Sequence, residues 1–338
     1  MSLKVSIIIK ALNEERNIAK AIESSLLVIS EIESGEVILA DSLSVDKTVE
    51  IASKYPIKIV QLTDQSDRSC GIGAQLGFQV AEGEYIYILD ADMEFESGFI
   101  HDAVALLEAN SRIAGVAGIV KEMNLDSLEF KKRSEKKHAN LRSGSVNSLD
   151  MGGLYRKEAL VDVGYFTNRN LNSYEEFELG SRLKTAGWKL LRIDRPSVKH
   201  YGHTMEAFKL LLKRWQSGYI FGIGELLRSA YRQPHFFFIL KNMKQLKLYV
   251  TYIIWWFVMT LSLITAITNG WGFLISSMLF LTPFVGMIIK KKSFYSGIYS
   301  VIASNLNAMG LCAGIFKRQR LAPSSVVNFT VVKDFKNQ

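Results

Sequence analysis

The sequence predicts an α/β domain with a mostly parallel sheet flanked by helices, followed by an interfacial helix and a C-terminal membrane-embedded helical region. Three observations lead to this architecture. Short apolar segments alternate with stretches of helical periodicity near the N-terminus, a basic amphipathic segment follows, and 42 consecutive residues then carry no charge. A chain of 338 residues has room for these parts, because folded domains commonly have about 100–200 residues.

The N-terminal alternation is built from apolar runs that are long enough for strands and too short for buried helices. The predicted strands are Val5–Ile9, Glu36–Ala40, Ile57–Leu62 and Tyr85–Leu89. The predicted helices between them are Glu14–Ser30, Asp46–Lys54 and Gly73–Ala81. We expect Asn13 to cap the first helix, because asparagine is a favoured N-cap residue. Such an alternation is typical of parallel sheets, in which ligands bind beyond the carboxyl ends of the strands.

Composition and short motifs exclude several classes of protein. Two cysteines, Cys70 and Cys312, are too few for a disulfide-stapled scaffold or a cysteine-rich zinc module. The turn after the first strand has no glycine, and the chain has no Gly-x-x-x-x-Gly-Lys-Ser/Thr segment, which argues against dinucleotide-binding and P-loop sites. The apolar stretch Val5–Ile9 is too short for the core of a signal peptide, so we expect the N-terminal part on the cytoplasmic side.

The uncharged segment predicts two membrane spans. A bilayer core needs about 20 apolar residues per helix, and we place the spans at Leu248–Thr268 and Trp271–Ile289, with a turn between them. Lysines precede the first span and follow the second, which puts both flanks in the cytoplasm by the positive-inside rule. The alternative is an apolar helical hairpin inside a soluble domain, but 42 uncharged residues exceed what globular helices need.

Three further segments leave alternatives open. Ser293–Phe316 is uncharged but less apolar, and a basic cluster follows it, so it is either a third span or a re-entrant or interfacial helix. Met205–Arg232 combines helical spacing with positive charge, which is typical of a helix in the membrane interface, although it can also be a surface helix of its own domain. The basic segment Lys131–Arg142 either meets an anionic lipid or forms a solvated helix face.

Two carboxylates follow the fourth predicted strand, at Asp90 and Asp92. Positions i and i+2 of an extended chain project to one face, so both side chains meet at the carboxyl edge of the sheet. Neighbouring carboxylates repel each other and favour a divalent cation, here Mg²⁺ or Mn²⁺, which can also bind a diphosphate. His200, after a later predicted strand, is a candidate to complete the metal site or to contact the diphosphate, and His203 is a second candidate.

Several segments in order give the chain a resemblance to a known family. They are VSIIIKALNEERNI (5–18), EVILADSLSVDKT (36–48), GAQLGFQVAEGEYIYILDADM (73–93), and GGLYRKEALVDVGYF (152–166) followed by SYEEFELGSRLKTAGW (173–188). The chain resembles family 2 glycosyltransferases of the GT-A fold over about residues 4–200. The membrane hairpin resembles that of subgroups that act on lipid-linked or membrane-translocated saccharides.

The resemblance implies a nucleotide site at the carboxyl ends of the first strands. Ala11 and Glu14 would line the nucleoside pocket, and Asp41 would accept a hydrogen bond from the base. Asp90 would lie beside the diphosphate of the nucleotide-sugar. The family often carries an Arg-Asn pair that this chain lacks, so Arg68 is a candidate to supply that positive charge.

The resemblance also implies the catalytic and metal-binding residues. Glu175-Glu176 matches the family's Glu-Asp pair, whose second member is the usual base, but a Glu in that place leaves open which of the two is the base. Asp90, Asp92 and His200 would hold Mg²⁺ or Mn²⁺. The base would deprotonate an acceptor oxygen, which attacks the anomeric carbon opposite the nucleotide and inverts its configuration. The structural alternative is a solvated, acidic start of a helix.

The sequence therefore predicts an inverting, metal-dependent glycosyltransferase of the hexosyltransferase type. The expected donor is a UDP- or GDP-sugar, and the expected acceptor is a polyprenyl phosphate or a lipid-linked glycan. Membrane lipids are further partners, and nucleic acid is not expected. One alternative is a processive polysaccharide synthase, although Leu211 stands where that class has the Gln of a Gln-x-x-Arg-Trp motif. Another is a non-catalytic membrane protein that binds a nucleotide-sugar or a lipid.

The predicted organisation has four parts. These are a GT-A catalytic domain at 1–203, amphipathic interfacial helices at 204–246, a transmembrane region at 247–320 and a C-terminal tail at 321–338. The protein is expected in the cell membrane as a multi-pass protein, with the catalytic domain in the cytoplasm.

Overall fold

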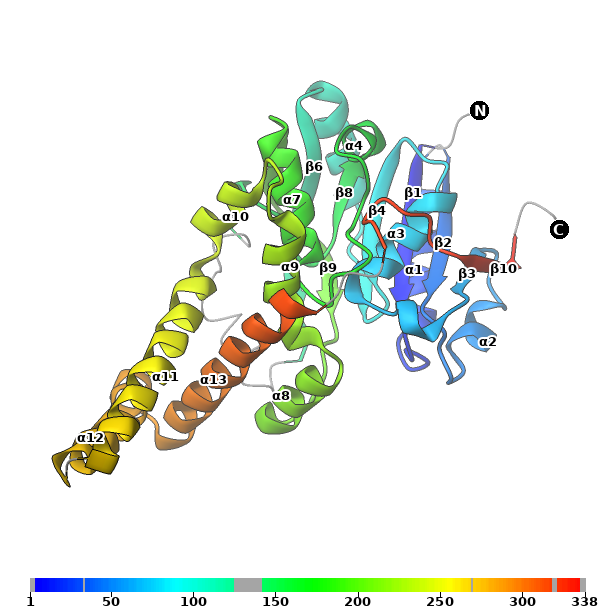
Figure 1. Cartoon of the computed structure of the whole chain (residues 1–338). Helices are drawn as coiled ribbons and strands as arrows, with labels where there is room; N and C mark the ends of the chain where they lie inside the picture. Colours follow the sequence, from blue (N-terminus) through cyan, green and yellow to red (C-terminus); the bar gives the residue numbers. More distant parts are fainter. Residues whose placement is uncertain (1–3, 33, 125–141, 269, 318–320, 335–338) are drawn as a thin grey trace. The chain divides into compact units, whose positions relative to one another are not determined.

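The computed structural model describes residues 4–32, 34–124, 142–268, 270–317 and 321–334 (Figure 1). The chain divides into two compact units. The sheet unit comprises Met1–Thr204 and Gln319–Gln338, and the helical unit comprises Met205–Arg318. The basic segment predicted at Lys131–Arg142 lies outside the described residues, except for Arg142 itself.

The sheet unit begins with alternating strands and helices. Its first four strands are β1 (Val5–Ala11), β2 (Gly35–Asp41), β3 (Lys58–Leu62) and β4 (Tyr85–Asp90). The segments between them form α1 (Ile18–Ser30), α2 (Thr48–Ala52), the 3-10 turn η1 (Gln65–Asp67) and α3 (Cys70–Val80). β1 pairs in parallel with β2 and β4, and β2 pairs in parallel with β3. The predicted α/β class and the parallel arrangement of these strands are confirmed.

The second half of the sheet unit adds antiparallel strands. These later strands are β5 (Met93–Phe95), β6 (Ile113–Glu122), β7 (Gly144–Ser145), β8 (Gly153–Arg156), β9 (Lys189–His200) and β10 (Phe329–Lys333). The helices here are α4 (Phe99–Ala109), α6 (Lys157–Asp162) and α7 (Glu175–Thr185). The described strands follow the order β10-β3-β2-β1-β4-β8-β6-β9-β5, with β7 paired to β9. β8 runs antiparallel to β4 and β6, whereas β6 and β9 are parallel.

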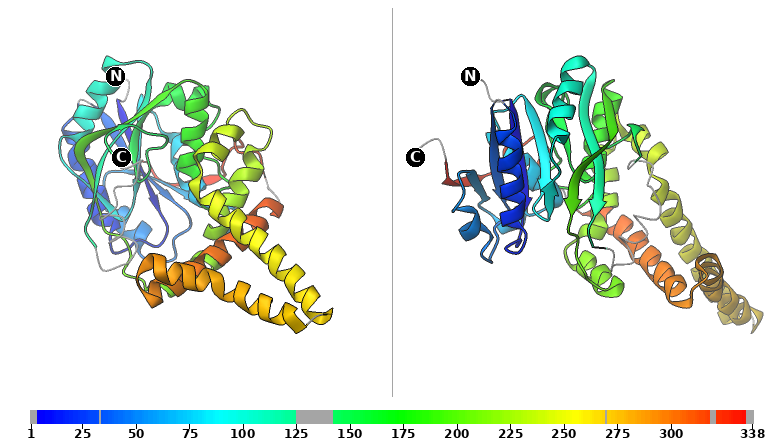
Figure 2. Two further views of the ribbon diagram at one scale, coloured as in Figure 1. Left: turned by 90° about the vertical axis from the view of Figure 1, so that its left-hand side faces the viewer. Right: turned by 180° about the vertical axis from the view of Figure 1, so that it is seen from behind.

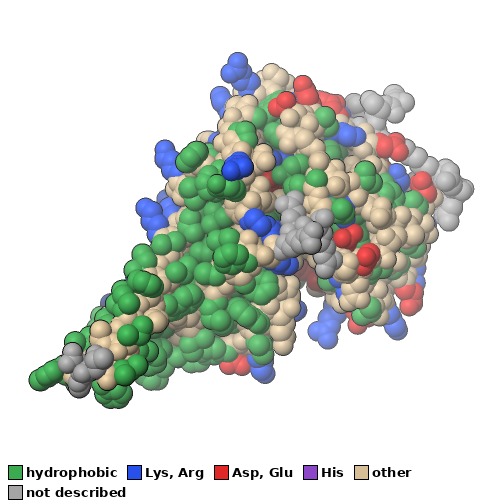
Figure 3. Space-filling model, viewed as in Figure 1, with side chains coloured by type: hydrophobic (Ala, Val, Ile, Leu, Met, Phe, Trp, Pro, Cys, Tyr) green, Lys and Arg blue, Asp and Glu red, His purple; other side chains and the backbone are tan. Residues whose placement is uncertain are grey.

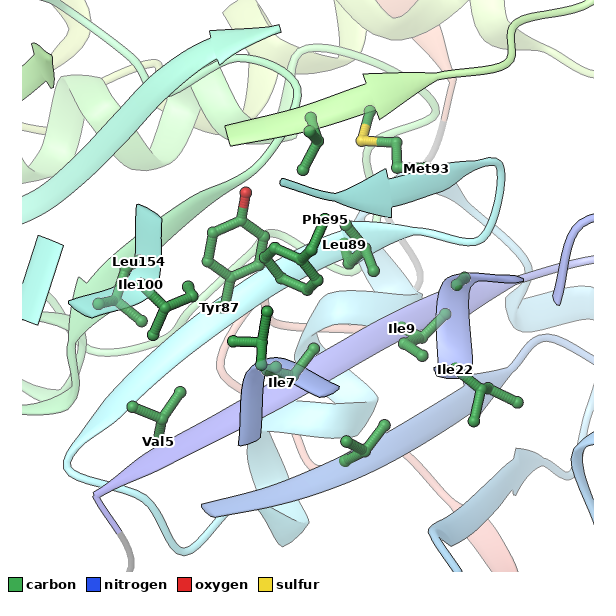
Figure 4. Close-up of a cluster of buried hydrophobic side chains, with 14 of the residues drawn as sticks. Val5, Ile7, Ile9, Ile22, Tyr87, Leu89, Met93, Phe95, Ile100 and Leu154 are labelled. Carbon is green, nitrogen blue, oxygen red and sulfur yellow. The ribbon is translucent and has the colours of Figure 1, made fainter. Parts of the chain in front are cut away.

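Two apolar layers, one on each face of the sheet, hold this unit together. Because side chains alternate along a strand, Ile7 and Ile9 of β1 face one layer, which also contains Ile22 of α1 (Figure 4). Ile8 faces the other layer, where α3 comes so close that a Cβ at Gly77 would lie 2.3 Å from the Ile8 side chain. Burying each such side chain contributes about 1.5–3 kcal/mol. With both faces covered, the carboxyl ends of the strands are the polar edge of the unit.

The first helix differs from its prediction. α1 begins at Ile18 rather than at Glu14, and Asn13 does not cap it. Asn13 has a left-handed backbone (φ 59°), and its Oδ1 accepts a hydrogen bond from the amide of Val45 at 2.8 Å. The Glu14 amide donates to Thr48 Oγ1 at 2.8 Å. These residues are held by the loop after β2, a contact between distant parts of the sequence that capping preferences do not capture.

The C-terminal segment returns to the sheet unit. β10 pairs antiparallel with β3, and Arg169 Nη1 donates to the carbonyl of Val326 at 2.6 Å. Gln79 binds the backbone of Val327 twice, because its Nε2 donates to the carbonyl at 2.9 Å and its Oε1 accepts from the amide at 2.6 Å. The segment predicted as a tail thus contains an edge strand of the sheet.

The helical unit contains the segment predicted to enter the membrane. It begins with α8 (Ala207–Gln216), the turn η3 (Tyr219–Phe221), α9 (Gly222–Ala230) and α10 (Phe236–Asn242). The long helices α11 (Lys244–Thr268), α12 (Gly270–Lys291) and α13 (Phe294–Phe316) follow, and Figure 2 shows them from two further sides. Within the described ranges these three helices are long and apolar enough to cross a membrane, with mean hydropathies of 1.9, 2.0 and 1.4. Figure 3 shows the apolar side chains exposed over this unit, which indicates membrane association.

Candidate active site

A lysine and an aspartate meet where β1 and β4 end. Lys10 and Asp90 are register partners in these parallel strands, so their side chains project to the same face. Lys10 Nζ lies 2.9 Å from Asp90 Oδ1. α3 leaves room for the lysine at Gly73, where an added Cβ would lie 3.3 Å from the Lys10 side chain. Asp90 is therefore held by an ion pair at the carboxyl edge of the sheet.

Two glutamates from the start of α7 join this pair. Glu175 Oε1 lies 3.8 Å from Lys10 Nζ, and Glu176 follows in the same helical turn. Glu176 Oε2 is buried and has no hydrogen-bond partner in the described part of the chain. The alternative of a solvated acidic helix start is wrong, because the side chains of Glu175 and Glu178 are only 13% and 1% exposed. A buried carboxylate oxygen without a hydrogen-bond partner is uncommon in folded proteins.

More carboxyl groups than cationic groups meet in this cluster. Burial raises the pKa of Glu176 well above its ordinary value; Lys10 opposes this rise, and the carboxylates of Asp150 and Glu175 add to it. Burial lowers the pKa of Lys10, but Asp90, Glu175 and Glu176 together raise it above its ordinary value. The lysine thus stays charged and partly offsets the carboxylates around it.

A second polar group lies just beyond β4. Met93 of β5 is the register partner of His200 in β9, and this pairing brings Asp92 beside the imidazole, with His200 Nε2 3.3 Å from Asp92 Oδ2. His200 Nδ1 lies 2.6 Å from Glu122 Oε2, because Glu122 of β6 is also a register partner of His200. Burial lowers the pKa of His200, but its hydrogen bonds to Asp92 and Glu122 raise it to about 9.

Asp92 and His200 form the donor set that fits a divalent cation. With a pKa of about 9, His200 carries a proton on both nitrogens at neutral pH, so a cation bound at Nε2 would displace the proton that faces Asp92, while Glu122 keeps its hydrogen bond to Nδ1 and orients the ring. In the ranges that the structure covers, no group of three or more His, Cys, Asp or Glu side chains is arranged to hold a metal by itself. Mg²⁺ often takes one or two carboxylates together with substrate phosphates, so two protein ligands fit a cation that binds with a diphosphate. Asp90, also predicted as a ligand, is bound by Lys10.

Asp41 lies at the end of β2 and organises the loop that follows. Its side chain is fully buried, and Oδ2 accepts hydrogen bonds from the Ser44 amide at 2.9 Å and from Gln61 Nε2 at 2.8 Å. Arg68 Nε donates to the carbonyl of Ser42 in the same loop at 2.8 Å. Asp41 and Arg68 thus both stabilise this loop. The predicted contacts of Asp41 with the base and of Arg68 with the diphosphate stay predictions.

Ala11 and Glu14 follow β1 beside this loop. Ala11 is buried, and its carbonyl accepts a hydrogen bond from the Ser42 amide at 2.9 Å. Burial raises the pKa of Glu14, and the carboxylates of Asp92 and Asp90 raise it further. The charges of both aspartates therefore act on the Glu14 carboxyl group, as expected for residues that share one edge of the sheet.

Two site residues were not predicted from the sequence. Lys10 ends the apolar strand VSIIIK, and a charged residue at the carboxyl end of a buried strand was a usable signal. Glu122 is 78 residues away from His200 in sequence and reaches it only through the pairing of β6 with β9. No local pattern predicts that pairing.

The fold agrees with the family that the chain matches. Residues 6–164 match the family described as "Glycosyl transferase family 2", so the chain carries a glycosyltransferase domain of this family. The resemblance found in the sequence is thereby confirmed. A solved structure of residues 1–349 of TarS from S. aureus, in complex with UDP-GlcNAc, has a similar fold, with a TM-score of 0.51, 19% identity, and coverage of 72% of this chain and 76% of that one.

Curated relatives belong to two groups by name. A probable glucomannan 4-beta-mannosyltransferase 10 of Arabidopsis thaliana is 25% identical over 70% of this chain and 47% of its own length. A dolichol-phosphate mannosyltransferase of Pyrococcus furiosus is 27% identical over 38% of this chain and 37% of its own length. A dolichyl N-acetyl-alpha-D-glucosaminyl phosphate 3-beta-D-2,3-diacetamido-2,3-dideoxy-beta-D-glucuronosyltransferase of Methanococcus voltae is 22% identical over 67% of this chain and 75% of its own. The chain thus spans about half the length of the glucomannan relative.

Proposed function

We propose that this chain is a membrane-bound, inverting glycosyltransferase that moves a hexose from a nucleotide-sugar donor to a lipid-linked acceptor with the help of a divalent cation. One observation carries the proposal: Glu176 Oε2 is buried without a hydrogen-bond partner among the described residues, in the same helical turn as Glu175, whose Oε1 lies 3.8 Å from Lys10 Nζ at the carboxyl edge of the sheet. A base close to a diphosphate-binding edge is what a single displacement at an anomeric carbon requires.

The chemistry follows from these residues. Glu176 removes the proton from an acceptor hydroxyl, and the acceptor oxygen attacks the anomeric carbon of the donor. The bond from that carbon to the diphosphate oxygen breaks, the nucleoside diphosphate leaves with the electron pair, and the configuration inverts. Glu176 later releases the proton to water. Asp92 and His200 would hold Mg²⁺ or Mn²⁺, which supplies positive charge to the diphosphate when bound.

The charge of the site favours a neutral acceptor group. Lys10 is the cation in contact with Asp90 and Glu175, and Glu176 adds a further carboxylate beside it. A phosphate acceptor entering this cluster would be repelled, whereas a hydroxyl carries no charge and gains a proton acceptor. We therefore favour a lipid-linked glycan over a polyprenyl phosphate as the acceptor.

The named relatives support the substrate classes. The TarS fragment was solved with UDP-GlcNAc, which supports a nucleotide-sugar donor, here a UDP- or GDP-sugar. The Methanococcus voltae relative is named for a dolichyl-linked sugar phosphate, which supports a lipid-linked saccharide as acceptor. Lysines lie at the start of α11 and at the end of α12, and the turn between the two helices has none. This distribution supports a multi-pass protein with its catalytic part in the cytoplasm.

Polysaccharide synthesis is the second candidate, favoured by the glucomannan mannosyltransferase relative. The two candidates predict different products. A transferase that acts on a lipid-linked glycan adds a single sugar and releases the product. A processive synthase keeps its product bound and lengthens it through many additions.

The test is a transfer assay on the full chain in detergent with Mn²⁺. UDP- and GDP-hexoses are offered with either a lipid-linked glycan or a polyprenyl phosphate, and the products are weighed by mass spectrometry. We expect one hexose to be added to the glycan, loss of transfer in Asp92→Asn, and unchanged transfer in Glu50→Gln, a control at an exposed position of α2. Products that carry many added sugars would favour the polysaccharide synthase. Transfer to the polyprenyl phosphate alone would refute the hydroxyl acceptor. The absence of transfer from every donor would refute the proposed transferase activity.

A further inference from the structure

The sheet unit contains both ends of the described chain, which constrains the membrane topology. β10 pairs with β3, with Phe329 opposite Leu62. Arg169 Nη1 also donates to the carbonyl of Ser325 at 3.3 Å. The residues before the helical unit and the residues after it therefore belong to one folded body, and one folded body lies on one side of a membrane.

This arrangement requires an even number of crossings within the helical unit. α11, α12 and α13 are each long enough to cross, but three crossings would leave the two ends of the unit on opposite sides. Eight residues lie between Phe316 and Ser325, fewer than the roughly 20 that a further helical crossing would need. At least one of the three helices therefore does not cross.

Contacts within the helical unit identify that helix as α13. Near its start, the rings of Tyr295 and Tyr299 pack edge-on against Phe208 of α8, with centroid distances of 5.6 and 5.3 Å. Just after its end, Lys317 Nζ lies 2.6 Å from Glu225 Oε1 of α9. α8 and α9 both precede the first span, so both ends of α13 lie beside chain that has not yet entered the membrane.

α13 and α9 also pack with almost no side chain between them. A Cβ at Gly314 would lie 2.1 Å from the carbonyl oxygen of Phe221, and a Cβ at Gly224 would lie 2.2 Å from the carbonyl oxygen of Leu311. α9 is therefore fixed against the C-terminal part of α13, where its buried Glu225 also pairs with Lys317.

The apolar surface that α13 exposes is smaller than that of α11 and α12. Its mean hydropathy is lower than that of α11 and α12, and 33% of it is buried by protein, compared with 6% and 11% for the other two. Its exposed side chains include a stripe at seven-residue spacing, which stays on one face of a helix. This stripe consists of Tyr295, Ile302, Met309 and Phe316.

We propose that α11 and α12 cross the membrane, whereas α13 lies along the membrane surface on the side of the sheet unit, with its exposed stripe against the lipid of that leaflet. The C-terminal segment then never leaves that side. The proposal concerns topology alone, so it holds or fails independently of the reaction proposed above.

Labelling of single cysteines tests this topology. In a background with Cys70→Ser and Cys312→Ala, one exposed residue at a time is replaced by cysteine in the full chain, and sealed membrane vesicles are treated with a membrane-impermeant maleimide. The positions are Lys54 in the sheet unit, Trp271 at the start of α12, Lys292 before α13 and Ser324 after it. We expect Lys54→Cys, Lys292→Cys and Ser324→Cys to react from one side and Trp271→Cys from the other. Reaction of Ser324→Cys from the side of Trp271→Cys would overturn the proposal.

The depth of the stripe gives a second readout. Each of the four stripe positions carries a cysteine-linked fluorophore in turn, and its quenching by lipids with nitroxides at known depth is measured. A surface helix places all four fluorophores at the same shallow depth. A crossing helix would place its ends about 32 Å apart along the membrane normal, from 21 residues at 1.5 Å each, with the middle positions deepest. The second pattern would also overturn the proposal.

Discussion

Glu176 and Glu178 lie two residues apart on α7 and have opposite surroundings. Glu178 is 1% exposed, and its two oxygens each lie 2.9 Å from a nitrogen of Arg182. The hydroxyl of Tyr165 donates a further hydrogen bond to Glu178 Oε1 at 2.6 Å. Glu176 Oε2 is also buried, but it has no partner among the residues that the structure describes.

The difference separates a charge that serves the fold from one that serves the site. Arg182 also donates to the carbonyls of Val163, Tyr165 and Phe166, so its pair with Glu178 fastens α7 to the segment after α6. A buried carboxylate that lacks such partners costs free energy rather than supplying it.

Replacing Glu176 should reduce the rate of transfer more than any other substitution considered below. Glu176→Gln keeps the shape of the side chain but cannot accept a proton, so the rate of transfer at saturating substrates should fall by roughly 10²–10⁴-fold. Glu178→Gln is the matched control, and its rate per folded molecule should stay within a few-fold of the wild type. Steady-state kinetics on both variants measure this. A wild-type rate in Glu176→Gln would remove Glu176 from the role of base.

For stability, the substitution at Glu178 should have the larger effect and the substitution at Glu176 the smaller one. Glu178→Ala leaves the guanidinium of Arg182 buried without its counter-charge, and the free energy of unfolding should fall by about 3–5 kcal/mol. Glu176→Ala removes a carboxylate whose Oε2 has no hydrogen-bond partner among the described residues, so it should lower stability far less. Urea denaturation of the solubilised chain compares the two variants. Equal losses would show that the two glutamates do not differ in the way described here.

A smaller effect is expected at the histidine. Glu122→Gln weakens the hydrogen bond that orients His200, and such changes commonly cost about 10–100-fold in metal affinity. Calorimetric titration of Mn²⁺ in the presence of a nucleoside diphosphate measures this without relying on turnover. Glu50→Gln is the control. Unchanged Mn²⁺ affinity in Glu122→Gln would show that His200 is not a ligand oriented by this carboxylate.

The smallest effect is a shift of the pH profile. Lys10 lowers the pKa of Glu176, whereas burial, Asp150, Glu175 and Asp90 raise it. Removing the lysine charge in Lys10→Met should therefore raise that pKa, so the base becomes ionised only at higher pH and the acidic limb of the kcat profile moves upward.

Lys10→Arg retains the charge at this position and is the control for that shift. Its acidic limb should stay near that of the wild type, even if the larger side chain slows the reaction. An acidic limb that does not move in Lys10→Met would show that Lys10 does not control the ionisation of the base.

The sequence was informative wherever a local pattern determines position. Short continuous apolar runs located the first strands, and parallel pairing then brought their carboxyl ends to one edge, which is where Asp41 and Asp90 lie. The 42 uncharged residues likewise located α11 and α12. In these cases the spacing of neighbouring residues is enough, because the structure repeats over a few residues.

Pairing between distant segments was not predictable in this way. The order of the later strands, and with it the contact of Glu122 with His200, depends on register between β6 and β9. The pairing of β10 with β3 involves only five residues of β10. A run this short does not show by itself whether it pairs with a distant strand. Asn13 failed as a cap for the same reason, since its partner is Val45 in another loop.

The anomeric configuration of the product distinguishes a single displacement with Glu176 as the base from a reaction in which Glu176 is the nucleophile. A carboxylate without a partner can act either as a base or as a nucleophile, and the two roles leave different stereochemistry. Proton NMR of the product made from a donor of known configuration reports it through the coupling of the anomeric proton. If Glu176 is the base, the product has the inverted configuration. A product that retains the donor's configuration would rule out the single displacement.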